Sequence, residues 1–350
     1  MKTFLRLAAA ALSAGALATT AIGQAVAAET VPVYRIAGPD RIATAVAASR
    51  TAWDDAGSKD GPTATAAVIS RYDDYADALG GSALAGTAGG PLLLTHTNYI
   101  DGATTNEVKR ILGTKGVVYV LGSTGAISAA AAKSLADKGY TVKRLAGTDR
   151  YATSVEVAKE VGRLGTTGHP QFVFATTGLN FPDGLAAGAT AAGYAAPVVL
   201  TKDSALPSVV KSYLTTEQAA GVDILAVGGA TAKAPFRWAG TLAGKDRYET
   251  AALIARAFWA DPKSTDDDAT AIGLATGENW PDALAGGALM ATAGPLVLSK
   301  QSSLPAATKA AATEIVKSAN PSTVQVGFLL GGPTVVTDGV KNAFALALNS

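Results

Sequence analysis

Three copies of a Gly-x-Asp-Arg segment carry the residues of this sequence that are best suited to binding chemistry. Each copy lies between a short apolar segment and a stretch with the pattern of a helix. Arginine presents a planar fork of donors that suits a carboxylate or a phosphate. The glycine permits a tight turn, and the aspartate can accept hydrogen bonds from the free N–H groups of the helix. The predicted anion-binding residues are Arg41, Arg150, Arg247, Gly38, Gly147 and Gly244, supported by Asp40, Asp149 and Asp246.

A second acidic residue recurs downstream of each copy, at Asp77, Asp183 and Asp282. An aspartate in the first turn of a helix complements the helix dipole. It can also pair with one of the repeated arginines, of its own module or of a neighbouring one, and so lock modules together. The sequence leaves open whether these arginines and aspartates bind a ligand or hold the modules to one another.

Residue patterns typical of catalytic sites are scarce. The sequence contains no cysteine and only two histidines, His96 and His169, neither of which has a His or Glu partner at helical spacing. No nucleophile-elbow, Walker or dinucleotide pattern occurs. A threefold recurrence of aspartates fits binding or packing better than it fits a single active centre. We therefore expect no catalytic residue, metal or cofactor.

The charge balance and the N-terminus bound the setting in which the protein works. The formal net charge is +1, which argues against a general basic field for nucleic acid. Lys2 and Arg6 precede an apolar run over residues 7–22, and Ala25-Val26-Ala27 matches a signal peptidase site. Residues 1–27 are therefore predicted to be a signal peptide, and no further segment is apolar enough to span a membrane.

The chain is built from three repeats, because four short signatures occur three times in the same order. The predicted modules are residues 31–139, 140–236 and 237–350. The first signature contains the Gly-x-Asp-Arg segment, and the second is an aromatic residue followed by Ala or Pro and then Asp. The third is a Pro-led apolar segment, and the fourth a strand that ends in glycine. The second, third and fourth signatures begin at Tyr75, Gly90 and Val120 in the first repeat. They begin at Phe181, Ala196 and Ala226 in the second repeat, and at Trp280, Gly294 and Leu329 in the third.

Apolar segments alternate with helical patterns in each repeat, which predicts an α/β fold with a parallel sheet covered on both faces. In the first repeat we expect strands over residues 33–37, 66–70, 92–95 and 117–121. The expected helices run over 40–50, 75–88, 104–112 and 128–138. Each module is thus a small doubly wound, Rossmann- or flavodoxin-like layer. The helices of the second signature are rich in Gly and Ala, which predicts a pseudo-trimer in which they meet around a threefold axis. The second module lacks most of its last helix, and residues 236–238 are expected to cover the gap.

The signatures Leu-Ala-Gly-x-Asp-Arg-Tyr, Pro-Asp-Ala-Leu-Ala and a strand ending in Gly-Gly resemble the cell-wall-binding type 2 repeat family. The resemblance implies non-covalent attachment of a secreted protein to the wall of a Gram-positive bacterium. The implied partner is an anionic, teichoic-acid-like secondary polymer, with peptidoglycan itself as the other possible wall partner. We expect the arginines and their glycine turns, identified above from the residues, to make the contacts. Two alternatives stay open, a wall-remodelling hydrolase or its modifier and an exported protein that binds a soluble ligand.

Overall fold

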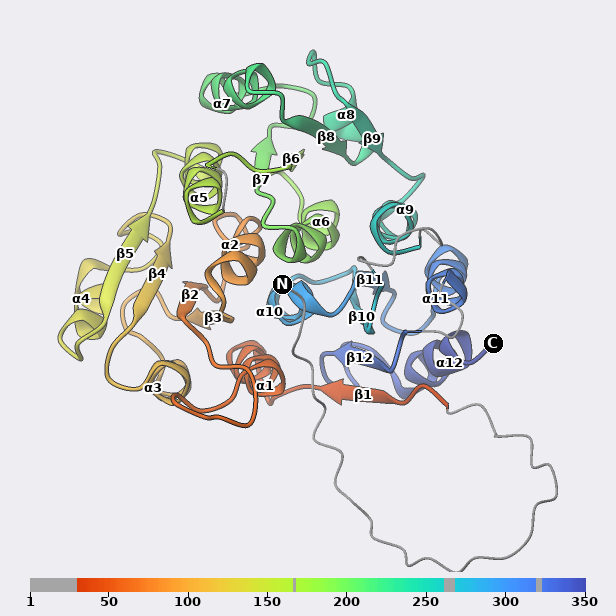
Figure 1. Ribbon diagram of the computed structural model, residues 1–350, viewed down its shortest axis with the longest axis horizontal. Coiled ribbons are helices and arrows are strands. Elements are labelled where there is room, and N and C mark those ends of the chain that lie inside the picture. Colours follow the sequence, from red (N-terminus) through yellow and green to blue (C-terminus); the bar gives the residue numbers. More distant parts are fainter. Residues whose placement is uncertain (1–29, 166–167, 261–267, 319–322) are drawn as a thin grey trace, which may run out of the picture.

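A computed structural model describes residues 30–165, 168–260, 268–318 and 323–350. The predicted signal peptide, residues 1–27, lies outside this range. The described chain forms three parallel sheets of four strands each, arranged around a common centre (Figure 1). No helix within the described ranges is both long and apolar enough to cross a membrane.

Each sheet has the same strand order, with β2, β6 or β10 in an inner position and the opening strand of a repeat, β5, β9 or β1, at one edge. This order is that of flavodoxin-like, doubly wound sheets, and it confirms the fold predicted from the sequence. Inner strands such as β2 and β6 are buried on both faces, which explains their continuous apolar sequence. The sheets are β3(Leu92–Thr95)-β2(Ala66–Arg71)-β4(Val117–Leu121)-β5(Thr141–Leu145), β7(Val198–Thr201)-β6(Phe172–Thr177)-β8(Asp223–Val227)-β9(Gly240–Leu242) and β11(Leu296–Ser299)-β10(Ala271–Thr276)-β12(Val326–Leu330)-β1(Val33–Ile36).

The sheets are offset from the sequence repeats by one strand. The opening strand of the second repeat, β5, pairs with β4 of the first, and β9 pairs with β8 in the same way. Strand β1 pairs with β12 at the other end of the chain, with Val33 opposite Gly327 and Ile36 opposite Leu330. The first strand of the described chain therefore closes a ring of three modules.

The small-residue helices α2 (Gly81–Ala88), α6 (Pro182–Gly193) and α10 (Pro281–Leu289) meet at the centre of that ring (Figure 1). At one level of this axis, a Cβ added to Gly86 would lie 2.7 Å from the Cβ of Ala192 and 2.9 Å from that of Ala291. At another level, Ser82 Oγ donates a hydrogen bond of 2.9 Å to the carbonyl of Leu284. These contacts confirm the predicted threefold arrangement of the helices.

One buried apolar cluster extends through all three modules. Leu79, Leu185 and Leu284 occupy equivalent positions in the three repeats, and all three belong to the same buried cluster. This shared cluster packs the three modules against one another, so they do not form separate, independent domains.

The start of helix α2 differs from the prediction. Helices α6 and α10 begin at a proline, which is pre-organised for the first helical position. The first repeat has Ala76 in place of that proline, and its helix begins only at Gly81, after a series of turns over residues 76–80. The prediction of a helix from residue 75 is therefore wrong by about one and a half turns.

Helices α1, α5 and α9 each follow the strand that closes one sheet (β1, β5 or β9) and lead to the inner strand of the next sheet. Each packs on the outer strand of its own repeat's sheet: α1 on β3, α5 on β7 and α9 on β11. Their bounds are Arg41–Ala52, Arg150–Leu164 and Arg247–Trp259. The peripheral helices are α3(Gly102–Leu112), α4(Ala129–Ala136), α7(Ser208–Ala219), α8(Gly229–Ala232), α11(Ala306–Ser318) and α12(Asp338–Leu348), with a 3₁₀ turn η1(Met290–Thr292) after α10.

The second module is shortened as the sequence predicts. Its last helix, α8, has 4 residues, whereas α4 has 8 and α12 has 11. Phe236 and Trp238 pack against the buried cluster of this module, with ring centroids 4.9 Å apart. These two aromatic side chains cover apolar surface that the missing helix leaves.

Candidate functional site

The repeated signatures come together at three equivalent places, which we call the seams. At each seam the Gly-x-Asp-Arg turn of one repeat meets the second-signature aspartate of the preceding repeat. Both follow the carboxyl ends of strands, which is the edge where open parallel sheets place their ligands. The first seam contains Asp77 and residues 147–150; the second contains Asp183 and 244–247; the third contains Asp282 and 38–41.

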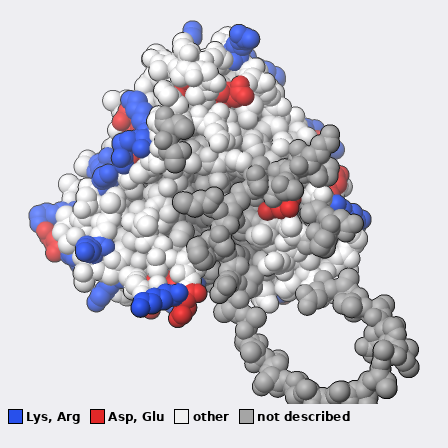
Figure 2. Space-filling view, viewed as in Figure 1, with Lys and Arg blue, Asp and Glu red and all other residues white. Residues whose placement is uncertain are grey.

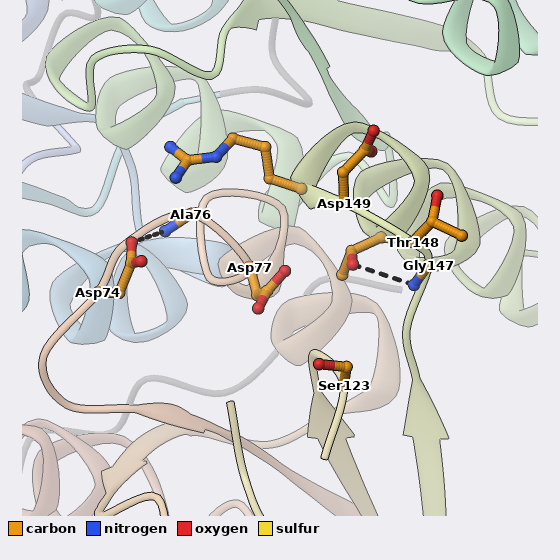
Figure 3. Close-up of a pocket in the computed structure, with 9 residues that line it drawn as sticks. Asp74, Ala76, Asp77, Ser123, Gly147, Thr148 and Asp149 are labelled. Atoms are coloured by element: carbon orange, nitrogen blue, oxygen red, sulfur yellow. Dashed lines mark hydrogen bonds between the residues drawn. The ribbon is translucent and has the colours of Figure 1, made fainter. Parts of the chain in front are cut away.

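The first seam contains an open polar pocket, here called the cavity, of about 160 Å³ (Figure 3). Asp77 lies between Ser123, which follows β4, and the turn that leads into α5. The cavity therefore draws on two sequence repeats, and neither repeat forms it alone. Its lining residues are Asp74, Ala76, Asp77, Ser123, Gly147, Thr148, Asp149, Arg150 and Thr153.

Each repeated arginine makes contacts on both sides of its seam, and the first of these is a hydrogen bond within its own repeat. Nη1 of Arg41 donates to the carbonyl of Tyr72 at 2.8 Å, and Nη1 of Arg150 donates to that of Gly178 at 2.7 Å. Arg247 makes the same bond to Gly277. Because these carbonyls follow β2, β6 and β10, each arginine is tied to its own repeat.

The same guanidinium groups lie over aromatic rings of the preceding repeat. The Cζ atom of Arg41 is 5.3 Å from the ring of Trp280, and that of Arg150 is 5.6 Å from the ring of Tyr75. Arg247 lies 5.9 Å from Phe181. Each arginine therefore links two modules through a carbonyl and a cation–π contact, and all three remain half-buried.

Direct Arg–Asp ion pairs do not form at the seams. Among the described residues, no ion pair within 4.0 Å joins one of these arginines to Asp77, Asp183 or Asp282. The charges still interact. Burial raises the pKa of Asp282, and contact with the Thr44 hydroxyl and the charge of Arg41 oppose that rise. Burial likewise raises the pKa of Asp77 and of Asp183, opposed by Arg150 and by Arg247.

The glycine of the turn is needed for close approach. A Cβ on Gly38 would lie 2.4 Å from the Cβ of Ala43 and 2.7 Å from the backbone nitrogen of Thr44. Gly147 and Gly244 are equally close to the first turns of α5 and α9. The N–H of Gly38 donates to the Thr44 hydroxyl at 3.0 Å, so the turn is folded against its own helix.

The first-signature aspartates cap these helices. Oδ1 of Asp40 accepts from the N–H of Ala43 at 2.8 Å, and Asp149 accepts from Ala152 at the same distance. Asp246 accepts from both Tyr248 and Glu249. Since N-cap bonds satisfy the free amides of the first turn, these carboxylates fix the direction in which each helix leaves its turn.

The second-signature aspartates fit against the glycine that ends the third strand of their own sheet. Gly122, Gly228 and Gly331 have φ of 87°, 85° and 105°, a region that favours glycine. A Cβ on Gly122 would lie 2.3 Å from Oδ2 of Asp77. This glycine forms the turn that follows the strand, and its lack of a side chain makes room for the carboxylate.

Two sets of seam residues were missed at the level of sequence. The threonines Thr44, Thr153 and Thr250 stand four positions after each capping aspartate and contact the second-signature aspartate of the preceding repeat. The aromatic residues Tyr75, Phe181 and Trp280 receive the arginines. Both sets lie inside the repeated signatures, so their recurrence was a usable signal.

The seams are not strongly basic. Each arginine has a capping aspartate and a buried aspartate close by, and the first cavity adds Asp74. On the described part of the face in Figure 2, Lys and Arg side chains form separate groups round the rim, and none of these groups extends into one continuous patch. Carboxylates accept hydrogen bonds from hydroxyl groups, whereas the arginine fork suits an anion. A seam therefore suits a ligand that carries both kinds of group.

The histidines do not join the seams as a metal centre. His169 lies 2.9 Å from Glu217 in the second module, and His96 lies in the first. Within the described ranges, no group of three or more His, Asp or Glu side chains is placed to hold a metal ion.

Comparison with known proteins gives matches over nearly all of the repeat region. The family model "Cell wall binding domain 2 (CWB2)" matches residues 35–132, 144–234 and 241–341. These three matches confirm the family resemblance and the three tandem repeats. Each match begins at or next to the strand that closes the preceding sheet.

Two curated proteins of Bacillus subtilis (strain 168) are similar to parts of this chain. The N-acetylmuramoyl-L-alanine amidase LytC is 28% identical over 269 residues, which cover 74% of this chain and 48% of the amidase. The Amidase enhancer is 28% identical over 173 residues, 49% of this chain and 22% of that protein. The chain spans less than half the length of these relatives.

Two solved structures share the fold. Cwp8 from Clostridium difficile has a TM-score of 0.75 at 22% identity, over 91% of this chain and 52% of its own. Cwp6 from Clostridium difficile has a TM-score of 0.75 at 23% identity, over 95% of this chain and 50% of its own. At this level of identity the likeness concerns the fold.

Proposed function

Because this chain belongs to the Cell wall binding domain 2 (CWB2) family, we propose that it attaches non-covalently to an anionic secondary polymer of the Gram-positive wall, such as a teichoic-acid-like glycan. The observation that carries the proposal is the threefold recurrence of a half-buried arginine at the carboxyl edge of the sheets, with one bonded nitrogen in each guanidinium. The contacts proposed are Arg41, Arg150 and Arg247 with the turns at Gly38, Gly147 and Gly244.

The chemistry of a seam fits such a polymer. The remaining guanidinium donors can bind a phosphate or carboxylate group bidentately. The neighbouring aspartates reduce the attraction for a bare anion, but they accept hydrogen bonds from the hydroxyl groups of a glycan. A single seam therefore binds weakly and prefers a chain of anionic and hydroxylated units over a free ion.

Repetition compensates for weak single sites. The seams lie on one rigid ring with a shared core, so binding at one seam holds the polymer near the others. The second and third contacts then form at a high effective concentration, which raises the overall affinity without any new contact. We place the protein outside the cell on its wall, after removal of the signal peptide, as a binding module without catalysis.

Co-sedimentation with isolated walls tests this proposal. The mature protein is mixed with native walls and with walls stripped of their secondary polymer by acid. We expect binding to native walls and its loss on stripped walls. Each change of Arg41, Arg150 or Arg247 to Gln should weaken binding roughly tenfold, and the triple variant should not sediment. Arg237→Gln, an exposed arginine outside the seams, is the matched control and should bind normally.

Other outcomes would contradict the proposal in distinct ways. Equal binding to native and stripped walls would identify peptidoglycan as the partner. Release of glycan or peptide fragments by the purified chain would support the hydrolase alternative. Thermal unfolding of each variant separates a lost contact from a lost fold, because the arginines also bridge modules.

A further inference from the structure

In module one three aromatic rings, Tyr72, His96 and Tyr99, form a group that we call the stack, and the equivalent positions of the other modules carry no aromatic residue. The His96 ring packs against Tyr72, with ring centroids 4.4 Å apart and an interplanar angle of 52°, and it stacks on Tyr99, at 4.5 Å and 21°. Tyr99 ends the stack and is 55% exposed. His96 stacks on the Tyr99 ring, and the exposed part of that side chain is open to solvent.

The backbone holds this stack in place without a ligand. The N–H of Tyr72 donates to the carbonyl of Thr95 at 2.8 Å, which extends the pairing of β2 with β3 and sets Tyr72 beside His96. The hydroxyl of Thr95 donates to the carbonyl of Tyr99 at 3.1 Å and accepts from the N–H of Asp101 at 2.8 Å. Such pre-organisation lowers the entropic cost of binding.

The stack continues into the third seam. Tyr72 contacts the guanidinium of Arg41, whose Cζ lies 6.0 Å from the Tyr72 ring and 5.3 Å from that of Trp280. Trp280 in turn lies 6.4 Å from Tyr75, at the centre of the ring of modules. A row of aromatic and guanidinium groups therefore leads from the exposed face of Tyr99 to a proposed polymer contact.

The equivalent positions in the other modules have a different chemistry. Tyr72 corresponds to Gly178 and Gly277, and Tyr99 to Ala205 and Ser303. The position of His96 is taken by lysines, Lys202 and Lys300, both exposed. The scaffold is therefore the same, but module one offers rings where modules two and three offer a cation.

We propose that Tyr99, backed by His96 and Tyr72, is a stacking subsite for one sugar ring of the wall polymer. This inference rests on the proposed function and names what module one recognises. One face of a sugar ring is a patch of C–H groups and its rim carries hydroxyls, which suits an aromatic face with polar neighbours. Asp101, whose Oδ2 is 3.7 Å from Nε2 of His96, offers an acceptor at that rim and disfavours a bare anion there.

Wall binding by Tyr99 variants is the first test. Tyr99→Ala should weaken binding to native walls by roughly three- to tenfold, whereas Tyr99→Phe keeps the ring and should bind as the unmodified protein does. Tyr34→Ala removes a tyrosine of similar exposure, 50%, on strand β1 and is the matched control. Unchanged binding by Tyr99→Ala, or an equal loss in Tyr34→Ala, would overturn the inference.

The two histidines supply a second, independent readout. His96 and His169 are the only histidines of the chain, so their ring signals can be followed separately by NMR. We expect N-acetylglucosamine to shift the His96 signals and leave His169 unchanged, and we expect Tyr99→Ala to abolish that shift. A shift caused by inorganic phosphate instead would show an anion site and overturn the inference. A sugar-dependent shift without any wall binding would support the stack while contradicting the proposed function.

Discussion

Gly86 tests how tightly the three modules meet at the axis. Replacing a glycine within a helix by alanine usually stabilises a protein, because alanine has the higher helix propensity by about 1 kcal/mol. At Gly86 the added Cβ would lie 2.6 Å from the carbonyl oxygen of Ala192 and 2.7 Å from its Cβ. Overpacking of this kind costs about 1–3 kcal/mol, and backbone contact on helix α6 places the cost near the upper end. Gly86→Ala should therefore destabilise the fold by about 1.5 kcal/mol.

Equilibrium unfolding in urea measures this change. A protein of this size has an m-value of about 3 kcal/mol/M, so the midpoint should fall by about 0.5 M. Gly102→Ala is the matched control, because Gly102 begins helix α3 and has no heavy atom within 4 Å of the added Cβ. The control should be neutral or slightly stabilising. Combining Gly86→Ala with Ala192→Gly should restore only part of the loss, since the carbonyl contact remains.

A Gly86→Ala variant as stable as the original protein would refute this reasoning. It would mean that the central helices separate at little cost, and the threefold contacts would then not be the feature that fixes the geometry of the seams. An equal change in the urea midpoint for Gly86→Ala and Gly102→Ala would mean that helix propensity alone explains the effect.

Three further predictions concern buried charge and ring closure. Glu107 is fully buried; burial acts to raise its pKa, but bonds from Arg110 and Ser49 outweigh burial and lower it. Glu107→Gln should therefore cost about 2–4 kcal/mol in urea unfolding, whereas Glu314→Gln at the exposed pair with Arg256 should cost less than about 1 kcal/mol. Burial raises the pKa of Asp282 above 3.8, so the native state binds more protons and wild-type stability falls as pH rises through the raised value. Asp282→Asn should accordingly gain stability relative to the original protein as pH rises above about 4, and a pH-independent difference in urea midpoint would contradict the assignment. Asn349 exchanges two hydrogen bonds with the backbone of Val31, and Asn349→Ala should speed hydrogen exchange in β1 and β12 while β4 and β5 stay protected.

The fold was largely predictable because its evidence is local and repeated. Apolar segments of four to six residues between helical patterns define the strands of a parallel sheet, and their recurrence defines three modules. The Gly- and Ala-rich composition of α6 and α10 indicated close helix packing before any contact was known. The start of α2 was predicted less well. Ala76 replaces the proline that begins α6 and α10, and the absence of that proline does not show where the helix begins instead.

The pairing of β1 with β12 was not predictable from these patterns. A strand's sequence shows that it is buried, but it does not show which of several equivalent sheets the strand joins. Val33 pairs with Gly327 although most of the chain separates the two residues. From its sequence, the strand before each Gly-x-Asp-Arg turn suits the sheet of its own repeat as well as that of the preceding repeat. The modules drawn from the sequence at 31–139, 140–236 and 237–350 stay a prediction about repeats, since the sheets cross those limits.

The role of the arginines was open at the level of sequence for a similar reason. Their acceptors are backbone carbonyls, which any residue supplies, and their aromatic partners belong to another repeat. The stack at Tyr99 was not predicted, because the prediction rested on residues that recur in all three repeats and these rings occur in one repeat alone. Positions where the copies differ, such as His96 against Lys202 and Lys300, carry the signal for what one module does alone.

The offset between repeats and sheets explains why binding residues lie at the seams. In the ring no repeat pairs its opening strand with its own sheet, because β1, β5 and β9 each join the sheet of the preceding repeat. An isolated copy in this arrangement would leave one strand unpaired and one sheet edge open. When the ring closes, β5, β9 and β1 pair with the open edges at β4, β8 and β12. The turn after each of these strands is thereby placed against the preceding module. Arg150 reaches Tyr75, and Thr153 reaches Asp77, only because β5 belongs to the first sheet. The strand exchange that completes the fold is thus also what assembles each seam, so a loss of ring closure should remove all three proposed contacts together.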